Sequence, residues 1–216
     1  MTLEKGNEMM RRGLLAAILF VLGLTAVAVP SSANAEGAKP TVVLVHGVFA
    51  DSSGWNPTIA ALQAAGFPVI AAANPLRDLE GDAAYVSSIV DTIPGPVIMV
   101  GHSYGGAVIT DAANGHDNVK ALVYVAALAP DQGESPLQLS TQFGLSGHSG
   151  APAWKAIPSW YVIPTADKVI PPAAQRFMAE RAGSKVREAE GASHAVMISR
   201  PDTVVRQILS AYYATR

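Results

Sequence analysis

One stretch decides the fold: Val97-Ile98-Met99-Val100-Gly101-His102-Ser103-Tyr104-Gly105-Gly106-Ala107-Val108-Ile109. It begins with four apolar residues that suit a buried strand and ends with residues that suit a helix. Between them lies a Gly-x-Ser-x-Gly turn, which in this strand–turn–helix context is typical of a nucleophile elbow. The bare five-residue pattern also arises by chance in chains rich in Gly and Ser, so the flanking elements carry the prediction. Ser103 is therefore the candidate nucleophile.

Strand and helix patterns alternate on both sides of this stretch. Apolar, β-branched or alternating runs predict further strands at 41–45, 67–71, 121–125, 159–163 and 185–189, the last of them an edge strand. Apolar residues at helical spacing predict helices at 55–65, 85–93, 171–182 and from 201 onward. The alternation predicts an α/β fold, a doubly wound and mostly parallel sheet of about six strands flanked by helices.

Residues 131–158 do not fit the alternation. They are polar, rich in Gly, Ser and Pro, and only weakly periodic. A segment of this length inside a compact domain is usually a lid or a binding loop. Because it follows the fourth strand, we expect it to rise from the same edge of the sheet as Ser103. We therefore predict one domain over residues 36–216 with a short lid at 131–158.

The first 35 residues have the pattern of a signal peptide. A basic start with Lys5, Arg11 and Arg12 precedes an apolar run at 13–29, and Ala33-Asn34-Ala35 is a small-x-small cleavage site. An uncleaved anchor is the alternative, but this run is at the short end of the roughly 17–25 residues that span a bilayer. We expect cleavage after Ala35, export to the periplasm or the medium, and no stable membrane association afterwards.

Composition narrows the function classes. A net charge of −2 gives no electrostatic basis for binding nucleic acid or an anionic membrane surface. The chain has no cysteine, which excludes disulfides and thiolate metal ligands. No metal-ligand spacing is present, so we expect neither metal nor cofactor. The expected partner is a small-molecule substrate, and the oligomeric state stays open.

A serine hydroxyl becomes a good nucleophile only when a neighbouring base takes its proton. His194 is the candidate base because it lies between the last predicted strand and the last predicted helix. Two other histidines have structural explanations, since His46 would pack beside a loop and His102 fills the variable position of the elbow. His116 and His148 lie in polar loops, where we expect them to be solvated.

The base in turn needs a carboxylate that orients it. Asp167 follows the fifth predicted strand, and Asp131 follows the fourth. Asp167 is the preferred acid, with Asp131 as the alternative that would otherwise be a turn residue at the start of the lid. The order Ser103, Asp167, His194 is the nucleophile–acid–base order expected after such an elbow.

Attack on an ester carbonyl creates an oxyanion, which needs preorganised N–H donors. The backbone N–H of Tyr104, at the start of the elbow helix, is one candidate. The other should come from the loop after the first strand, His46-Gly47-Val48. We assign it to Val48, with Phe49 as the close alternative.

Together these motifs resemble the α/β-hydrolases, in particular the small serine esterases related to plant methylesterases and hydroxynitrile lyases. The resemblance covers essentially all of residues 36–216 and rests on four segments: His46-Gly47-Val48 with Trp55, Gly101 to Gly106, Asp167, and Ser193-His194-Ala195. It implies the same fold and cofactor-free hydrolysis. Relatives carry a larger cap than 131–158, which leaves the substrate preference open.

The resemblance implies an exported serine carboxylesterase that works through an acyl-enzyme on Ser103. Lyase relatives carry a threonine at the position of Gly47 and a lysine at that of Ala195, so this chain favours hydrolysis. Three alternatives remain: a non-catalytic, receptor-like binding protein, a hydroxynitrile lyase, and perhydrolysis by the same triad. The natural ester and its acyl and alcohol groups are not determined by these patterns.

Overall fold

The computed structural model describes residues 38–135 and 147–216. Ala35–Arg216 form one compact unit. The predicted signal peptide and the middle of the predicted lid lie outside the described residues. Within the described ranges, no helix is long and apolar enough to cross a membrane.

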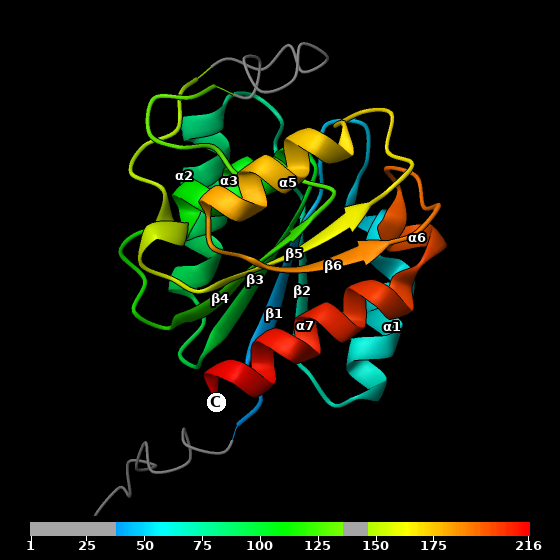
Figure 1. Cartoon of the computed structure of the whole chain (residues 1–216). Coiled ribbons are helices and arrows are strands. Elements are labelled where there is room, and N and C mark those ends of the chain that lie inside the picture. Colours follow the sequence, from blue (N-terminus) through cyan, green and yellow to red (C-terminus); the bar gives the residue numbers. More distant parts are fainter. Residues whose placement is uncertain (1–37, 136–146) are drawn as a thin grey trace, which may run out of the picture. The chain divides into compact units, whose positions relative to one another are not determined.

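A single parallel sheet organises the described chain (Figure 1). Its strand order is β2-β1-β3-β4-β5-β6, and every neighbouring pair is parallel. The strands are β1 (Thr41–Val45), β2 (Val69–Ala72), β3 (Val97–His102), β4 (Val119–Val125), β5 (Ser159–Pro164) and β6 (Lys185–Ala189). The prediction of a parallel sheet of about six strands is confirmed.

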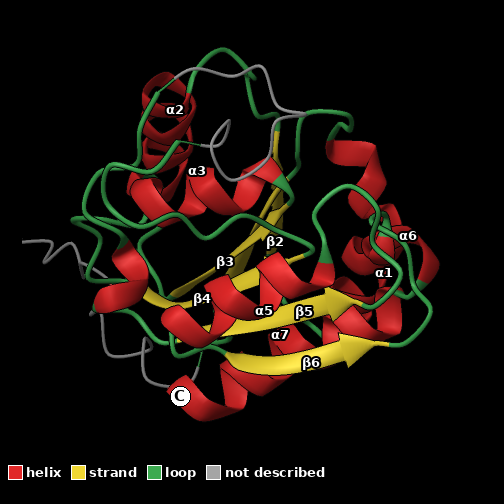
Figure 2. Cartoon of the chain, turned by 45° about the horizontal axis from the view of Figure 1, so that its top comes forward, coloured by secondary structure: helices red, strands yellow, loops and turns green. Residues whose placement is uncertain are grey.

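Helices cover both faces of this sheet, as predicted for a doubly wound fold. One face carries α2 (Leu79–Asp91), α3 (Tyr104–Ala112) and α5 (Pro172–Arg181) (Figure 1). The other carries α1 (Asn56–Ala64), α6 (Val196–Ser199) and α7 (Pro201–Thr215). Two short 3-10 turns complete the described elements, η1 (Ser52–Trp55) and η2 (Ala153–Lys155). The arrowheads of β5 and β6 end beside α6 (Figure 2).

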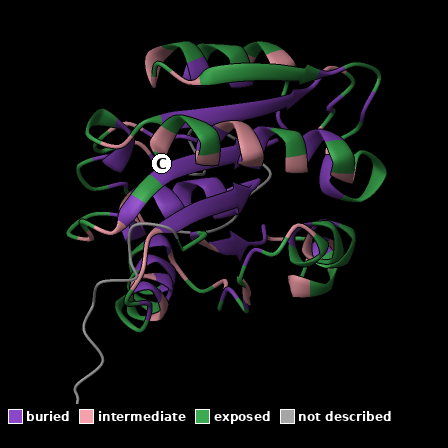
Figure 3. Cartoon of the chain, turned by 90° about the horizontal axis from the view of Figure 1, so that it is seen from below, coloured by how far each residue is buried: buried purple, intermediate pink, exposed green. Residues whose placement is uncertain are grey.

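Side chains of the central strands alternate between two cores. In β1, Val43 and Val45 join the core under α2, α3 and α5, whereas Val42 and Leu44 join the core under α1 and α7. Successive strand residues point to opposite faces, and both faces are covered by helices. This is why the central strands are apolar throughout, and Figure 3 shows them buried.

The edge strand β6 differs from the prediction of an alternating pattern. Residues 185–188 are all exposed, and Val186 keeps 48% of its surface accessible. β6 has a partner strand on one side only, because it lies at the edge of the sheet. The bounds of β6 were predicted correctly, but the alternation of buried and exposed residues along it was not found.

The helix α2 also begins earlier than its apolar pattern indicated. Asp78 caps its start, because its carboxylate accepts the N–H of Gly81 at 2.8 Å. The helix therefore starts at Leu79 and ends at Asp91, whereas the pattern predicted 85–93.

The described ends of the predicted lid are attached to α3 and α5. Ser149 donates its hydroxyl hydrogen to Asp111 of α3 at 2.6 Å. Arg181 of α5 binds both carboxylate oxygens of Glu134, at 2.7 and 2.8 Å. The Trp154 indole donates to the Pro130 carbonyl at 2.9 Å. These contacts anchor the described residues at both ends of the segment, and the lid itself stays a prediction.

Candidate active site

Ser103 lies at the sharp corner between β3 and α3. Its backbone has φ 57° and ψ −125°, a left-handed conformation that residues with a side chain rarely adopt. The corner is tight on both sides. A Cβ on Gly101 would lie 2.4 Å from the Gly105 carbonyl oxygen, and one on Gly105 would lie 2.4 Å from the Val45 carbonyl oxygen. The two motif glycines are therefore required by the close approach of helix and strands.

His194 reaches this corner from the loop between β6 and α6. The Ser103 hydroxyl Oγ lies 2.9 Å from His194 Nε2, and Asp167 Oδ2 lies 2.8 Å from His194 Nδ1. An ionised carboxylate only accepts hydrogen bonds, so Nδ1 carries the ring proton and Nε2 is free to accept the serine proton. The structure thus brings the three predicted residues together in the order required for proton transfer.

Asp167 is held by more than its contact with His194. It follows β5 and accepts the N–H groups of Val169 and Ile170 at 2.8 and 3.0 Å and the Gln175 amide at 2.8 Å. Burial alone would raise the pKa of this carboxyl. The hydrogen bond to His194, the electrostatic interaction with that ring and the two backbone donors outweigh burial and lower the pKa of the carboxyl below its ordinary value. The carboxylate is therefore ionised beside the imidazole.

Asp131, the alternative acid, is placed elsewhere. Its carboxylate pairs with Lys155 at 2.5 Å and accepts the Gln132 N–H at 2.7 Å. Both groups belong to the ends of the 131–158 segment. Of the two candidates, Asp167 is the one that contacts His194.

The two segments that carry the predicted oxyanion donors both lie next to Ser103. Tyr104 is the first residue of α3, so its N–H has no acceptor within the helix and lies at the positive end of the helix dipole. The loop after β1 passes directly beside the serine. A Cβ on Gly47 would lie 2.6 Å from Ser103 Cβ and 3.1 Å from its Oγ. Val48 follows Gly47 in this loop, and the donor role of both N–H groups stays a prediction.

Asp82 supports the elbow and was not found from the sequence. It is completely buried in the first turn of α2, where it accepts the Tyr104 hydroxyl at 2.8 Å and the Arg77 N–H at 3.1 Å. Burial, then the hydrogen bond to Asp82, raises the pKa of the Tyr104 phenol well above its ordinary value. In a sequence, an acidic residue in the first turn of a helix is usually explained by its favourable interaction with the helix dipole. The contact of Asp82 with Tyr104 is therefore found only from the packing of α2 on α3.

The remaining histidines divide into buried and peripheral ones. His46 is buried, and its Nε2 accepts the Asn74 N–H at 3.1 Å. His102 is also buried and lies against His194. His148 is exposed, as predicted. The prediction that His116 is solvated is wrong, because its side chain is only 10% exposed and bonds to the Ser87 hydroxyl at 2.7 Å.

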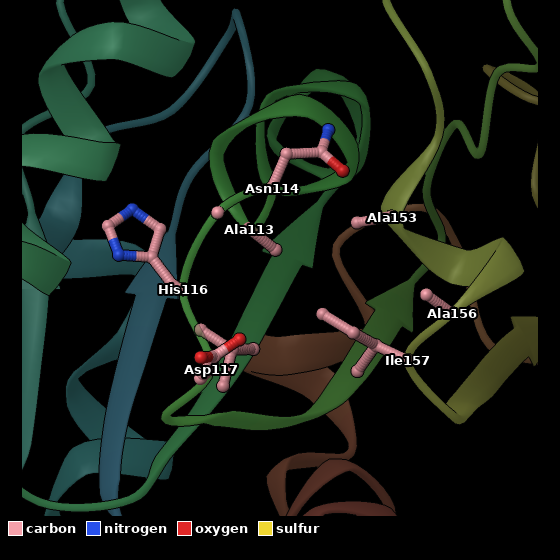
Figure 4. A pocket seen from close by; sticks show the side chains of 9 residues that line it. Ala113, Asn114, His116, Asp117, Ala153, Ala156 and Ile157 are labelled. Atoms are coloured by element: carbon pink, nitrogen blue, oxygen red, sulfur yellow. The ribbon is translucent and has the colours of Figure 1, made fainter.

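A cavity of about 290 Å³ lies at the opposite edge of the sheet (Figure 4). It is formed by the turn between α3 and β4 together with η2 and the residues after it. Its position at the amino end of β4 separates it from Ser103, which follows the carboxyl end of β3. Across residues 38–135 and 147–216, no three His, Asp or Glu side chains are grouped to hold a metal ion.

Comparison with known sequences places the chain among hydrolases. The profile of the alpha/beta hydrolase family matches residues 42–147 and 134–207. A carbendazim hydrolyzing esterase from Nocardioides sp. is 33% identical over 110 residues, which are 45% of this chain and 46% of that enzyme. The chain thus spans about half the length of this curated relative.

Solved structures of the same architecture extend the comparison. A pyrethroid hydrolase from Sphingobium faniae superposes with a TM-score of 0.66 at 22% identity, over 81% of this chain and 98% of that one. A methylesterase from Arabidopsis superposes with a TM-score of 0.67 at 21% identity, over 81% and 99%. At these identities the likeness shows the fold. With the family profile matching most of its length, the chain belongs to the alpha/beta hydrolase family.

Proposed function

We propose that this chain is a serine esterase that cleaves carboxylic esters of small molecules. The observation that carries the proposal is the continuous hydrogen-bonded series from Ser103 Oγ through His194 to Asp167, with separations of 2.9 and 2.8 Å. The names of the relatives, a carbendazim hydrolyzing esterase and a pyrethroid hydrolase, support an ester of a small molecule as substrate.

In the first half-reaction, His194 Nε2 takes the proton of Ser103 as Oγ attacks the ester carbonyl carbon. The carbonyl oxygen becomes an oxyanion that the N–H groups of Val48 and Tyr104 stabilise. The C–O bond to the alcohol then breaks, and His194 returns its proton to the leaving alkoxide. The products are a free alcohol and an acyl-enzyme on Ser103.

In the second half-reaction, His194 removes a proton from a water molecule that attacks the acyl carbon. The bond to Ser103 breaks, the serine regains its proton, and a carboxylic acid leaves. Asp167 stays ionised throughout, holds the proton on Nδ1 and stabilises the imidazolium that forms twice in each cycle.

Two measurements on Ser103→Ala test the nucleophile. The wild type is expected to hydrolyse p-nitrophenyl acetate and butyrate and to be labelled by a fluorophosphonate probe, and Ser103→Ala is expected to lose both properties. The matched control is Ser88→Ala, which changes an exposed serine of α2 and should leave both unchanged. Hydrolysis that survives in Ser103→Ala contradicts the assignment. A wild type that binds esters without turnover favours the receptor-like alternative.

A further inference from the structure

His102 occupies the variable position of the Gly-x-Ser-x-Gly turn, yet its side chain contacts the candidate base. It is 4% exposed, and its Nε2 lies 3.0 Å from the backbone carbonyl oxygen of His194. The centroids of the two imidazole rings are 4.8 Å apart. The Trp55 ring also meets His102 edge-on, with centroids 6.3 Å apart. His102 is therefore a buried side chain in contact with both Trp55 and His194.

The acceptor determines the protonation of this ring. A carbonyl oxygen has no hydrogen to donate, so His102 Nε2 carries the proton. Nδ1 is buried and has no hydrogen-bond partner among the described residues. Burial, followed by the electrostatic effect of nearby His194, lowers the pKa of His102 to about 3. The hydrogen bond to the His194 carbonyl and the charge of Asp167 oppose this shift, and His46 adds to it. The ring of His102 is thus a neutral hydrogen-bond donor at neutral pH.

The backbone of His194 lies outside regular secondary structure. It lies in a short loop, and the adjacent Ala195 has an irregular backbone conformation with φ −79° and ψ 44°. The side chain of His194 is fixed at both ring nitrogens by Asp167 and Ser103. The hydrogen bond from His102 fixes its main chain as well.

We propose that His102 is a positioning residue for hydrolysis, whose donated hydrogen bond keeps His194 within reach of Ser103. The inference rests on the proposed function. Since His102 and Ser103 are consecutive in the chain, the turn that presents the nucleophile also holds the base that activates it. The hydrogen bond thus links the main chain of the base to the turn that carries Ser103, whose Oγ lies 2.9 Å from His194 Nε2.

Two substitutions of His102 distinguish the effect of its hydrogen-bond donor from the effect of its aromatic ring. His102→Gln keeps an N–H at about the same distance from the backbone, and His102→Phe keeps an aromatic ring without a donor. Misplacement of a reacting group by about 1 Å costs on the order of a hundredfold in rate. We expect His102→Phe to lower kcat for p-nitrophenyl acetate about 10- to 100-fold with little change in KM, and His102→Gln to stay within about threefold of the wild type. The control, His116→Gln, replaces a largely buried histidine at the opposite edge of the sheet and should keep wild-type kinetics.

Nuclear magnetic resonance of ¹⁵N-histidine-labelled protein tests the contact without activity. His102 should give one neutral Nε2–H signal that does not titrate between about pH 5 and 9. Wild-type kcat in His102→Phe, equal losses in the Phe and Gln variants, or a titrating or Nδ1-protonated His102 would each overturn the inference. A wild type that neither hydrolyses esters nor takes the fluorophosphonate label would instead reject the proposed function, and the His102 signal would still decide the contact.

Discussion

The backbone of Ser103 is strained and held in place by its neighbours. A left-handed conformation costs a residue with a side chain about 1–3 kcal/mol. Here the Ser103 N–H donates to the Val125 carbonyl at 3.2 Å, and its own carbonyl accepts the N–H groups of Gly106 and Leu128 at 3.0 Å each. Three backbone hydrogen bonds from β4, α3 and the segment after β4 thus converge on one residue and keep its hydroxyl directed at His194.

Replacing Asp167 with asparagine should abolish most of the activity. An asparagine amide would donate to Nδ1 and move the ring proton of His194 to Nε2, where it can no longer accept from Ser103. We expect kcat for p-nitrophenyl esters to fall about 10³- to 10⁴-fold. Asp131→Asn is the matched control and should retain wild-type kcat. Equal activity of the two variants would show that neither residue is the acid.

The buried His102 should make stability depend on pH. Its pKa is lowered from 6.5 to about 3 in the folded state. Below pH 6.5 the unfolded chain binds a proton at His102 that the folded chain does not bind, so stability falls as the pH falls, until the folded ring also titrates near pH 3. His102 alone should contribute a slope of about 1.4 kcal/mol per pH unit within this window.

Urea denaturation of the wild type and His102→Gln between these pH values measures this contribution. The stability advantage of the wild type over the variant should shrink as the pH is lowered. His148→Gln, which changes an exposed histidine, should keep the wild-type slope. Parallel curves for the wild type and His102→Gln would contradict the prediction.

The packing of α3 against β1 requires a residue without a side chain at Gly105. Gly105 lies in the first turn of α3, where a Cβ would be 2.4 Å from the Val45 carbonyl oxygen and 2.9 Å from that of His46. Both contacts are backbone atoms of β1 and the loop that follows it, so neither can rotate away. The separation of helix and strand is therefore set by this glycine, and with it the distance between Ser103 and the Val48 loop.

Gly105→Ala should consequently destabilise the fold and impair catalysis together. Overpacking of this kind costs about 1–3 kcal/mol, which urea denaturation would measure as a lower free energy of unfolding. Gly95→Ala is the matched control, because a Cβ there meets no atom within 4 Å. We expect the control to stay within about 0.5 kcal/mol of the wild type. A fully stable Gly105→Ala would show that α3 can shift away from β1 freely.

The compact unit Ala35–Arg216 should fold without the residues before it. A chain that begins at Glu36 is expected to unfold cooperatively and to hydrolyse p-nitrophenyl esters, because the sheet and both cores lie within the unit. A chain that begins at Gly47 lacks β1, the strand between β2 and β3, and should not fold. Loss of folding in the first truncation would contradict the predicted domain boundary.

We propose in addition that residues 1–35 direct export of the chain and are removed by cleavage after Ala35. Expression of the full-length chain in a bacterium, followed by N-terminal sequencing, should give a protein that starts at Glu36 and is found outside the cytoplasm. An intact N-terminus in the membrane fraction would favour the anchor alternative.

Local sequence patterns were sufficient for most of the architecture. A strand buried on both faces is apolar throughout, and a helix buried on one side has apolar residues at helical spacing. The strands β3 and β5 and the helix α7 could be predicted from these patterns. Ser103, Asp167 and His194 were identified because strand ends in a parallel sheet converge on one edge. The exposed face of β6 and the early start of α2 were missed, since packing partners and a side-chain cap decided them.

The sequence by itself determined the fold class and pointed to a candidate nucleophile, a candidate base and two candidate acids, because each depends on residue type and chain order. The choice of Asp167 over Asp131 for the contact with His194 came only from the tertiary structure, since both acids follow a strand and differ only in where their side chains meet a partner. The hydrogen bonds of Asp82 and His102 could likewise not be predicted from the sequence, because a hydrogen bond between distant segments produces no periodic pattern of residues. Contacts of that kind arise only when the sheet brings the segments together.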